Sequence, residues 1–181
     1  MLLPVTDGAL RLCVPDATMD SEIRAYREVF LREGGSMDGT GSLRRFENPS
    51  DWLAYNHLCA DAATTPPQLV DQTQLVGVRE ADGRIVGMLQ IRHKFNDFLE
   101  KYGGHIGYSV RPDERRKGYA TWMLQSALPV CREVGIARVL ITCLVDNEGS
   151  RRTILRCGGA YESTVHEPER GLDLERYWID L

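Results

Sequence analysis

The sequence predicts an α/β (α+β) fold in which helices flank a mixed β-sheet. Some segments repeat apolar residues at helical spacing, whereas others alternate apolar and polar residues or form short apolar runs. Along the chain these segments form a meander of strands, then strand, helix, strand, helix and two more strands. This order is typical of a sheet that contains both parallel and antiparallel neighbours.

The first half of the chain is expected to contain two helices and a hairpin. A Gly-rich polar segment at 34–40 indicates a flexible loop, and Asn48-Pro49-Ser50-Asp51 marks the start of the second helix. The turn Ala81-Asp82-Gly83 between two apolar stretches predicts the hairpin. The expected strands are 9–14, 74–79 and 84–92, and the expected helices are 18–32 and 52–63. The buried face of the first helix is predicted to be Ile23, Tyr26, Val29 and Phe30.

The second half is expected to alternate strands with helices. Pro129 lies within the longest helical pattern and is expected to kink or shorten that helix. The expected strands are 105–110, 138–145, 161–166 and 176–181, and the expected helices are 95–101, 116–134 and 147–157. The apolar stripe of the long helix consists of Ala120, Met123, Leu124, Ala127, Cys131 and Val134.

Length and composition narrow the class of protein. A chain of 181 residues is expected to form one domain, 1–181. Its formal net charge of −4 argues against nucleic acid and against anionic membrane surfaces as partners. No apolar run approaches the ~20 residues of a membrane span, and the first residues lack the features of a signal peptide. Five cysteines without a C-x-x-C pair argue against a disulfide framework or a metal site, and favour a reducing cytoplasm.

A basic turn joins the strand at 105–110 to the following helix. Its sequence, over 108–120, is Tyr-Ser-Val-Arg-Pro-Asp-Glu-Arg-Arg-Lys-Gly-Tyr-Ala. The first N–H groups of a helix lack intrahelical partners, and the helix dipole adds positive charge there. Gly118 lets a phosphate approach the backbone, and the cations Arg115, Arg116 and Lys117 surround it. The spacing matches neither a P-loop nor a Rossmann fingerprint, so the turn predicts a different kind of diphosphate site.

This turn resembles motif A of the GNAT superfamily of acetyltransferases, written Arg/Gln-x-x-Gly-x-Gly/Ala. Arg115, Gly118 and Ala120 fill its three defined positions, and Val110-Arg111-Pro112 matches the V-x-P that precedes it. The run 102–108 and the closing 176–181 resemble a branch of bacterial acetyltransferases. The resemblance covers about 75–181. It implies a mixed, twisted central sheet with helices on both faces, and acetyl-coenzyme A as the acyl donor.

The resemblance also implies the residues that bind the donor. The segment Asn147 to Ser150 matches a second family pattern, N-x-x-Ala/Ser, whose Asn lies near the cofactor. The implied cofactor-binding residues are Tyr108, Ser109, Val110, Arg115, Arg116, Lys117, Gly118, Tyr119, Ala120, Asn147 and Ser150.

The implied reaction is direct transfer of the acetyl group to a primary amine in a ternary complex, with the Val110 N–H stabilising the oxyanion. Two positions depart from the family. His105 stands where many members carry the Glu that acts as general base, and Ile154 stands where many carry an acidic Tyr. The general acid is left open between Tyr161, Tyr108 and water.

The acceptor, a small molecule or a peptide amine, is also left open, as is a homodimer through the last strands. Two alternative functions stay open as well: a sensor that binds acyl-coenzyme A without turnover, and a transferase of a longer acyl group.

Overall fold

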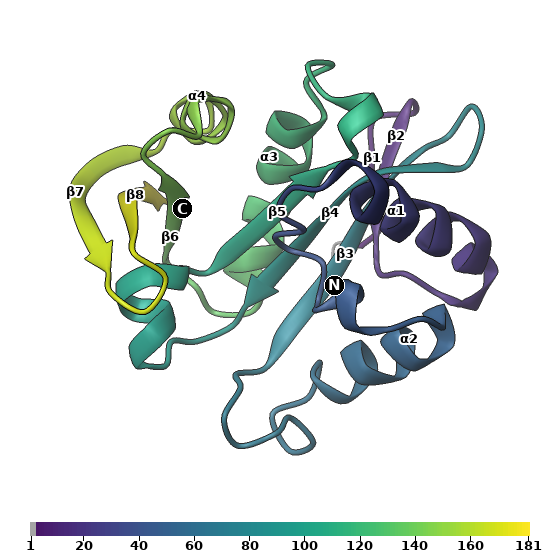
Figure 1. Cartoon of the computed structure of the whole chain (residues 1–181), viewed down its shortest axis with the longest axis horizontal. Helices are drawn as coiled ribbons and strands as arrows, with labels where there is room; N and C mark the ends of the chain where they lie inside the picture. The colour runs from purple at the N-terminus through teal and green to yellow at the C-terminus, as the bar shows by residue number, and fades with distance from the viewer. Residues whose placement is uncertain (1–2) are drawn as a thin grey trace.

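The larger of two sheets has five strands that pair in chain order, each antiparallel to its neighbour (Figure 1). The computed structural model describes residues 3–181. Met1 and Leu2, which belong to the segment expected to lack the features of a signal peptide, lie outside the described residues. The sequence pattern did not predict β1, because two residues carry no periodicity. The strands are β1 (Val5–Thr6), β2 (Leu10–Cys13), β3 (Gln72–Arg79), β4 (Arg84–Arg92) and β5 (Ile106–Val110).

Two helices from the N-terminal half, α1 (Asp20–Glu33) and α2 (Pro49–Leu58), pack on one face of this sheet (Figure 1). The four predicted side chains of α1 are buried, and three of them, Ile23, Tyr26 and Phe30, pack in one cluster with Val76, Val78, Ile85 and Met88 of β3 and β4. Helix α2 ends before the expected Ala63. The Thr64 hydroxyl donates to the Leu58 carbonyl over 2.6 Å, which satisfies an acceptor at the end of the helix.

Helix α3 (Tyr119–Glu133) covers the other face of the sheet. Met123, Leu124, Ala127 and Cys131 of its predicted stripe are buried against Leu12, Leu75 and Leu89 of β2, β3 and β4, among others. The helix continues through Pro129 and is not shortened there. Its buried apolar stripe therefore outweighs the hydrogen bond that a proline cannot donate.

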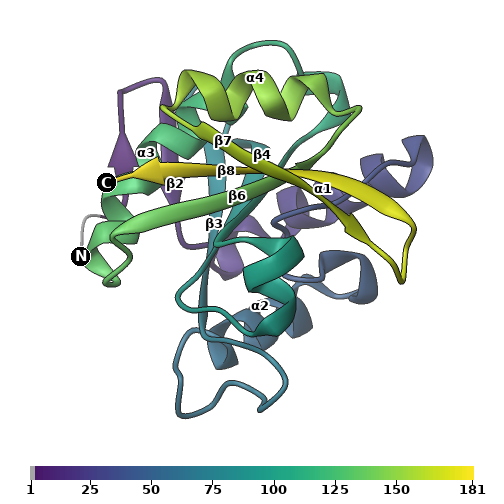
Figure 2. The same cartoon turned by 90° about the vertical axis from the view of Figure 1, so that its left-hand side faces the viewer.

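A second antiparallel sheet has the strand order β6-β8-β7. Its strands are β6 (Arg138–Leu144), β7 (Ala160–Glu167) and β8 (Leu172–Asp180). Figure 2 shows α4 (Glu148–Arg156) running along one side of this sheet. Asn147 caps the start of the helix, because its Oδ1 accepts from the Ser150 N–H over 3.0 Å, as expected for an N-cap.

The two sheets separate between β5 and β6, and this separation determines where the site lies. At its base, the His105 N–H donates to the Leu140 carbonyl over 2.8 Å. Within residues 3–181, no further backbone hydrogen bond joins 106–110 to β6. The fold class is therefore confirmed, but the expected mixed central sheet consists of two antiparallel sheets that meet at this point.

No helix within residues 3–181 is long and apolar enough to cross a membrane.

Candidate active site

The turn between β5 and α3 holds its backbone in a conformation that suits an anion. Arg116 and Gly118 both have positive φ, 65° and 85°, and α3 begins directly afterwards at Tyr119. A Cβ on Gly118 would meet no atom within 4 Å, so the space above this residue is open. The unpaired N–H groups of the first helical turn therefore face a free surface.

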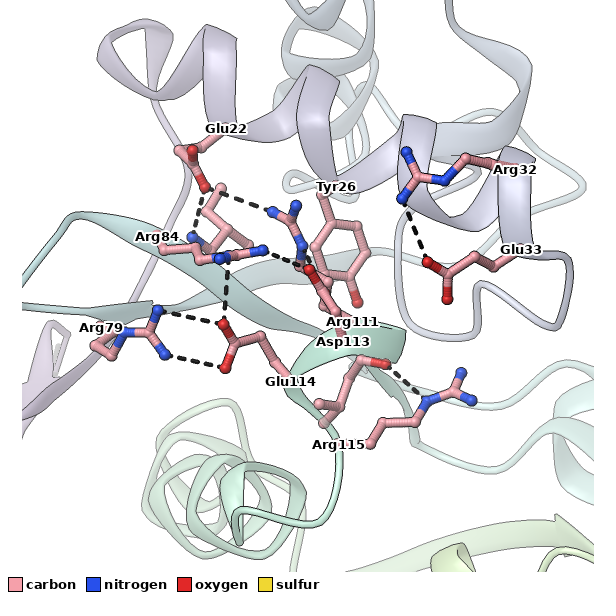
Figure 3. A network of polar contacts seen from close by, with 12 residues as sticks. Glu22, Tyr26, Arg32, Glu33, Arg79, Arg84, Arg111, Asp113, Glu114 and Arg115 are labelled. Carbon is pink, nitrogen blue, oxygen red and sulfur yellow. Dashed lines mark hydrogen bonds and ion pairs between the residues drawn. The ribbon is translucent and has the colours of Figure 1, made fainter.

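A buried carboxylate anchors the same turn (Figure 3). Glu114 is 3% exposed, and its carboxylate accepts from Arg79 at 3.0 and 3.2 Å and from Lys117 at 2.6 Å. Arg84 lies 3.4 Å from Glu114 and 2.5 Å from Asp113. Burial alone would raise the pKa of Glu114, but the hydrogen bonds from Lys117 and Arg79 outweigh it and lower that pKa. The turn is thus tied to β3 and β4.

A cavity of about 1080 Å³ opens between β5, the turn and α4. Ten of the eleven predicted cofactor-binding residues line it: Tyr108, Ser109, Val110, Arg115, Arg116, Gly118, Tyr119, Ala120, Asn147 and Ser150. Lys117 does not line the cavity, because its ammonium group is bound to Glu114. The cavity also extends past β5 to Asp38, Arg92 and Tyr102.

The free edge of β5 presents backbone N–H groups to this cavity. On its paired side, the Arg92 N–H donates to the His105 carbonyl at 2.8 Å and the Arg111 N–H donates to the Val86 carbonyl at 3.0 Å. Residues of an antiparallel strand alternate between the two edges, so the N–H groups of Tyr108 and Val110 point away from β4. They are the hydrogen-bond donors that a thioester arm lying along this edge would meet.

A hydroxyl pair lies across the cavity from that edge. The Tyr108 hydroxyl is 2.7 Å from the Ser150 Oγ, which belongs to the first turn of α4. Burial raises the pKa of Tyr108, and the hydrogen bond to Ser150 only partly opposes this effect. The phenol therefore keeps its proton at neutral pH, and its place in the cavity, not an enhanced acidity, makes it a candidate proton donor.

His105 lies outside this cavity. Its side chain is buried, with the ring centroid 4.0 Å from that of Phe95 and 6.5 Å from that of Trp178. Burial and the charge of Arg92 lower the pKa of His105 to about 4. Its Nδ1 accepts from the Leu140 N–H over 2.9 Å, so the ring proton is on Nε2 and no lone pair is free. This geometry does not support its predicted role as general base.

Tyr161 also lies apart from the cavity lining. It is 57% exposed on β7, and its hydroxyl is 2.9 Å from Thr164 Oγ1. Ile154, at the position of the family's acidic Tyr, is fully buried. Of the three acids left open by the sequence, Tyr108 is thus the side chain that lines the cavity.

Several residues of the site were missed by the sequence analysis. On the donor side, Arg156 of α4 lines the cavity together with Arg152, whereas Arg151 is held by Glu175 at 2.7 and 2.8 Å. On the opposite side, Asp38 lines the cavity from the Gly-rich segment that was expected to be a flexible loop.

A close approach of two backbones places Asp38 there. A Cβ on Gly39 would lie 2.1 Å from the Gly107 carbonyl oxygen, and the Ser109 hydroxyl donates to the Asp38 carbonyl over 2.7 Å. Only glycine permits this contact, and Gly39 also has a positive φ of 70°. The signal for this contact in the sequence was the pair Gly39 and Gly107. It could not be recognised locally, because the two glycines lie far apart along the chain.

Comparisons with solved structures agree with this architecture. The chain is similar to the ribosomal-protein-S5-alanine acetyltransferase from Vibrio fischeri, with a TM-score of 0.76 and 14% identity over 98% of this chain and 96% of that one. It is also similar to the microcin C7 self-immunity acetyltransferase solved with acetyl-CoA and AMP (TM-score 0.69, 20% identity, 97% and 94% covered). A third relative is the ribosomal L7/L12 alpha-N-protein acetyltransferase in complex with coenzyme A (TM-score 0.70, 17% identity, 99% and 97% covered).

At these identities the likeness concerns the fold. No curated protein sequence matches the chain significantly. The model of the acetyltransferase (GNAT) family, however, matches residues 38–158, more than half of the chain. This stretch contains the turn, the free edge of β5 and the start of α4, and so most of the lining of the cavity. The chain therefore belongs to the GNAT family of acetyltransferases, whose acyl donor is acetyl-coenzyme A.

Proposed function

We propose that this protein is an N-acetyltransferase that moves the acetyl group of acetyl-coenzyme A directly to a primary amine. The observation that carries the proposal is the junction of two features in one cavity. A cationic turn with open helix N–H groups lies at one end, and a free strand edge leads from it toward Asp38. The first suits a diphosphate, and the second suits an extended thioester arm.

The donor-binding residues follow from this arrangement. The N–H groups of the turn, Arg115 and Arg116 would bind the diphosphate, and Arg152 and Arg156 would face the remaining phosphate of the coenzyme. Arg115 also donates from Nε to the Val110 carbonyl over 3.2 Å, which ties its side chain to the strand edge. The predicted oxyanion donor, Val110, has its N–H on that edge. The Tyr108 N–H points the same way but lies two residues, about 7 Å, along the strand, so we assign the oxyanion to one of these two donors and not to both at once.

Asp38 is proposed to receive the acceptor amine. It is the acidic side chain that lines the cavity beside β5, whereas Glu148 lies on α4 and pairs with Arg152. Its carboxylate would hold the ammonium group and accept, through water, the proton that must leave before nitrogen attacks. The neutral amine then forms a C–N bond with the thioester carbon.

Collapse of the tetrahedral adduct breaks the C–S bond. The nitrogen loses its second proton to solvent, from which the phenolate is reprotonated, and the leaving thiolate gains one, so that an amide and a free thiol result. We propose that Tyr108 supplies the proton to sulfur, with Ser150 hydrogen-bonded to the phenol. The enzyme then needs no acidic Tyr at the position of Ile154.

The proposed acceptor class is a small or peptide amine. Two of the similar structures are named for acetylation of ribosomal proteins, and another is named a microcin C7 self-immunity acetyltransferase. We further propose that 1–181 form a single domain. A reducing cytoplasm is proposed as its compartment, supported by the five cysteines, which are all unpaired thiols.

The test is a thiol-release assay with acetyl-coenzyme A and a panel of amines, followed by mass spectrometry of the products. Amine-dependent release with a mass gain of one acetyl group would support N-acetyl transfer. Saturable coenzyme binding without release for any amine would favour the acyl-coenzyme A sensor instead. Faster release from longer acyl thioesters would favour the transferase of a longer acyl group.

A further inference from the structure

One cation lies where two cavities meet. Arg92, the last residue of β4, lines the large cavity and also a smaller one of about 360 Å³ on the α2 side of the sheet. Phe98 likewise lines both cavities. The guanidinium group therefore lies on the side of β5 that is proposed to receive the amine.

The Arg92 side chain is fixed but its charge is unmatched. Its Nη1 donates to the carbonyls of Gly103 and Gly104 at 3.0 and 3.3 Å. Among residues 3–181 it forms no ion pair with a carboxylate. Burial lowers the pKa of Arg92, and the charge of Asp38 only partly opposes this effect. A held, partly desolvated cation in a cavity is a site for an anion.

Arg170 provides a contrast within the same cavity. Its Nε lies 2.7 Å from the Glu167 carboxylate, and its guanidinium group is 5.6 Å from the centroid of the Phe98 ring. The charge of Arg170 is thus already compensated by the protein. Arg92 and Asp38 also face the cavity. They differ from Arg170 because they are not paired with each other.

We propose that the acceptor is an amine that also carries a carboxylate, with Asp38 holding its ammonium group and Arg92 its carboxylate. This proposal rests on the proposed N-acetyltransferase function and names the substrate class. The planar guanidinium group matches a carboxylate in two parallel hydrogen bonds. A phosphate dianion fits less well, because Asp38 adds negative charge and Arg170 is already paired.

The spacing favours an amino acid over a long peptide. Arg92 Nη2 lies 3.2 Å from where a Cβ of Gly107 would stand. Gly107 immediately precedes Tyr108, whose N–H is one of the two proposed oxyanion donors. One residue of a strand spans about 3.4 Å, so the carboxylate site lies within a few bonds of the reacting nitrogen.

The experiment measures binding rather than turnover. The protein, saturated with coenzyme A, is titrated calorimetrically with alanine, glutamate and phenylalanine, each compared with its α-amide. We expect at least one acid to bind about tenfold or more tightly than its amide. Arg92→Gln should abolish this preference, Arg92→Lys should retain part of it, and Arg170→Gln should leave it intact. The affinity for coenzyme A should be the same in all variants.

The absence of any acid-over-amide preference in the wild type would overturn the proposal, as would equal losses in Arg92→Gln and Arg170→Gln. If Arg92→Gln does not fold, the wild-type pairs and Arg92→Lys still decide the question. A preference without turnover would support the carboxylate site while contradicting the transferase. Turnover of amines without this preference would support the transferase and contradict the carboxylate site.

Discussion

Replacing Glu114 by glutamine removes the charge that ties the coenzyme-binding turn to the sheet. The glutamine has nearly the same shape, so the change tests the carboxylate itself. Three cations lose a partner: Arg79, Arg84 and Lys117. Removing one member of a buried ion pair costs about 3–5 kcal/mol when the other charge is left alone.

Here the cost should be smaller than that range. Arg79 keeps Asp82 at 2.7 Å, Arg84 keeps Asp113 at 2.5 Å, and the Lys117 side chain is 51% exposed to water. We therefore expect Glu114→Gln to lower the free energy of unfolding by about 2–3 kcal/mol. For a chain of this length, that loss corresponds to a fall in Tm of about 5–8 °C.

Urea and thermal unfolding at pH 7 measure this loss, with Asp82→Asn as the matched control. Asp82 pairs with the same arginine, but its side chain is 46% exposed, so its loss should cost much less than the loss of Glu114. The Kd for acetyl-coenzyme A should also rise in Glu114→Gln and not in the control. A loss below about 1 kcal/mol in Glu114→Gln, or equal losses in the two variants, would show that Glu114 does not anchor the turn.

Three other variants probe the remaining parts of the site. Tyr108→Phe should lower kcat about 10- to 100-fold at an unchanged Kd for acetyl-coenzyme A, and an unchanged kcat would exclude the phenol as the acid. His105 has a pKa of about 4 when folded and binds a proton near 6.5 when unfolded, so wild-type stability should fall as the pH drops from 6.5 to 4. Urea unfolding at several pH values should show a fall in the free energy of unfolding of up to about 3 kcal/mol in the wild type, and a smaller fall in His105→Gln. An equal dependence on pH in the two proteins would contradict the burial of His105 as a neutral ring. Arg156→Gln should weaken binding of coenzyme A about threefold or more and leave 3′-dephospho-coenzyme A unaffected, whereas equal weakening would remove Arg156 from the phosphate site.

Local patterns predicted the elements that depend on local chemistry. The Ala81-Asp82-Gly83 turn predicted the β3–β4 hairpin, and the spacing from Ile23 to Phe30 predicted the buried face of α1. The motif around Arg115 and Gly118 likewise predicted a turn whose backbone faces open space. Each of these features is contained within one short stretch of chain.

Features that depend on distant contacts were not predictable in the same way. His105 immediately precedes β5. The strand pattern gave no sign that Trp178 lies near its ring or that the Leu140 N–H donates to its Nδ1. Asp38 belongs to a Gly-rich segment with no apolar period, and its position depends on the contact between Gly39 and Gly107. The separation of the two sheets similarly depends on pairings that a single strand does not encode.

The most direct measurement is calorimetric titration of acetyl-coenzyme A into the wild type, Gly118→Glu and Gly135→Glu. Both glycines flank α3 with φ near +85°, at 85° and 88°, and a Cβ at either position meets no atom within 4 Å. The two variants therefore carry the same backbone strain and the same added charge, but only Gly118 lies at the cavity. We expect saturable binding to the wild type and to Gly135→Glu, and none to Gly118→Glu. No binding to the wild type, or equal binding to both variants, would contradict the assignment of the donor site to the turn that begins α3.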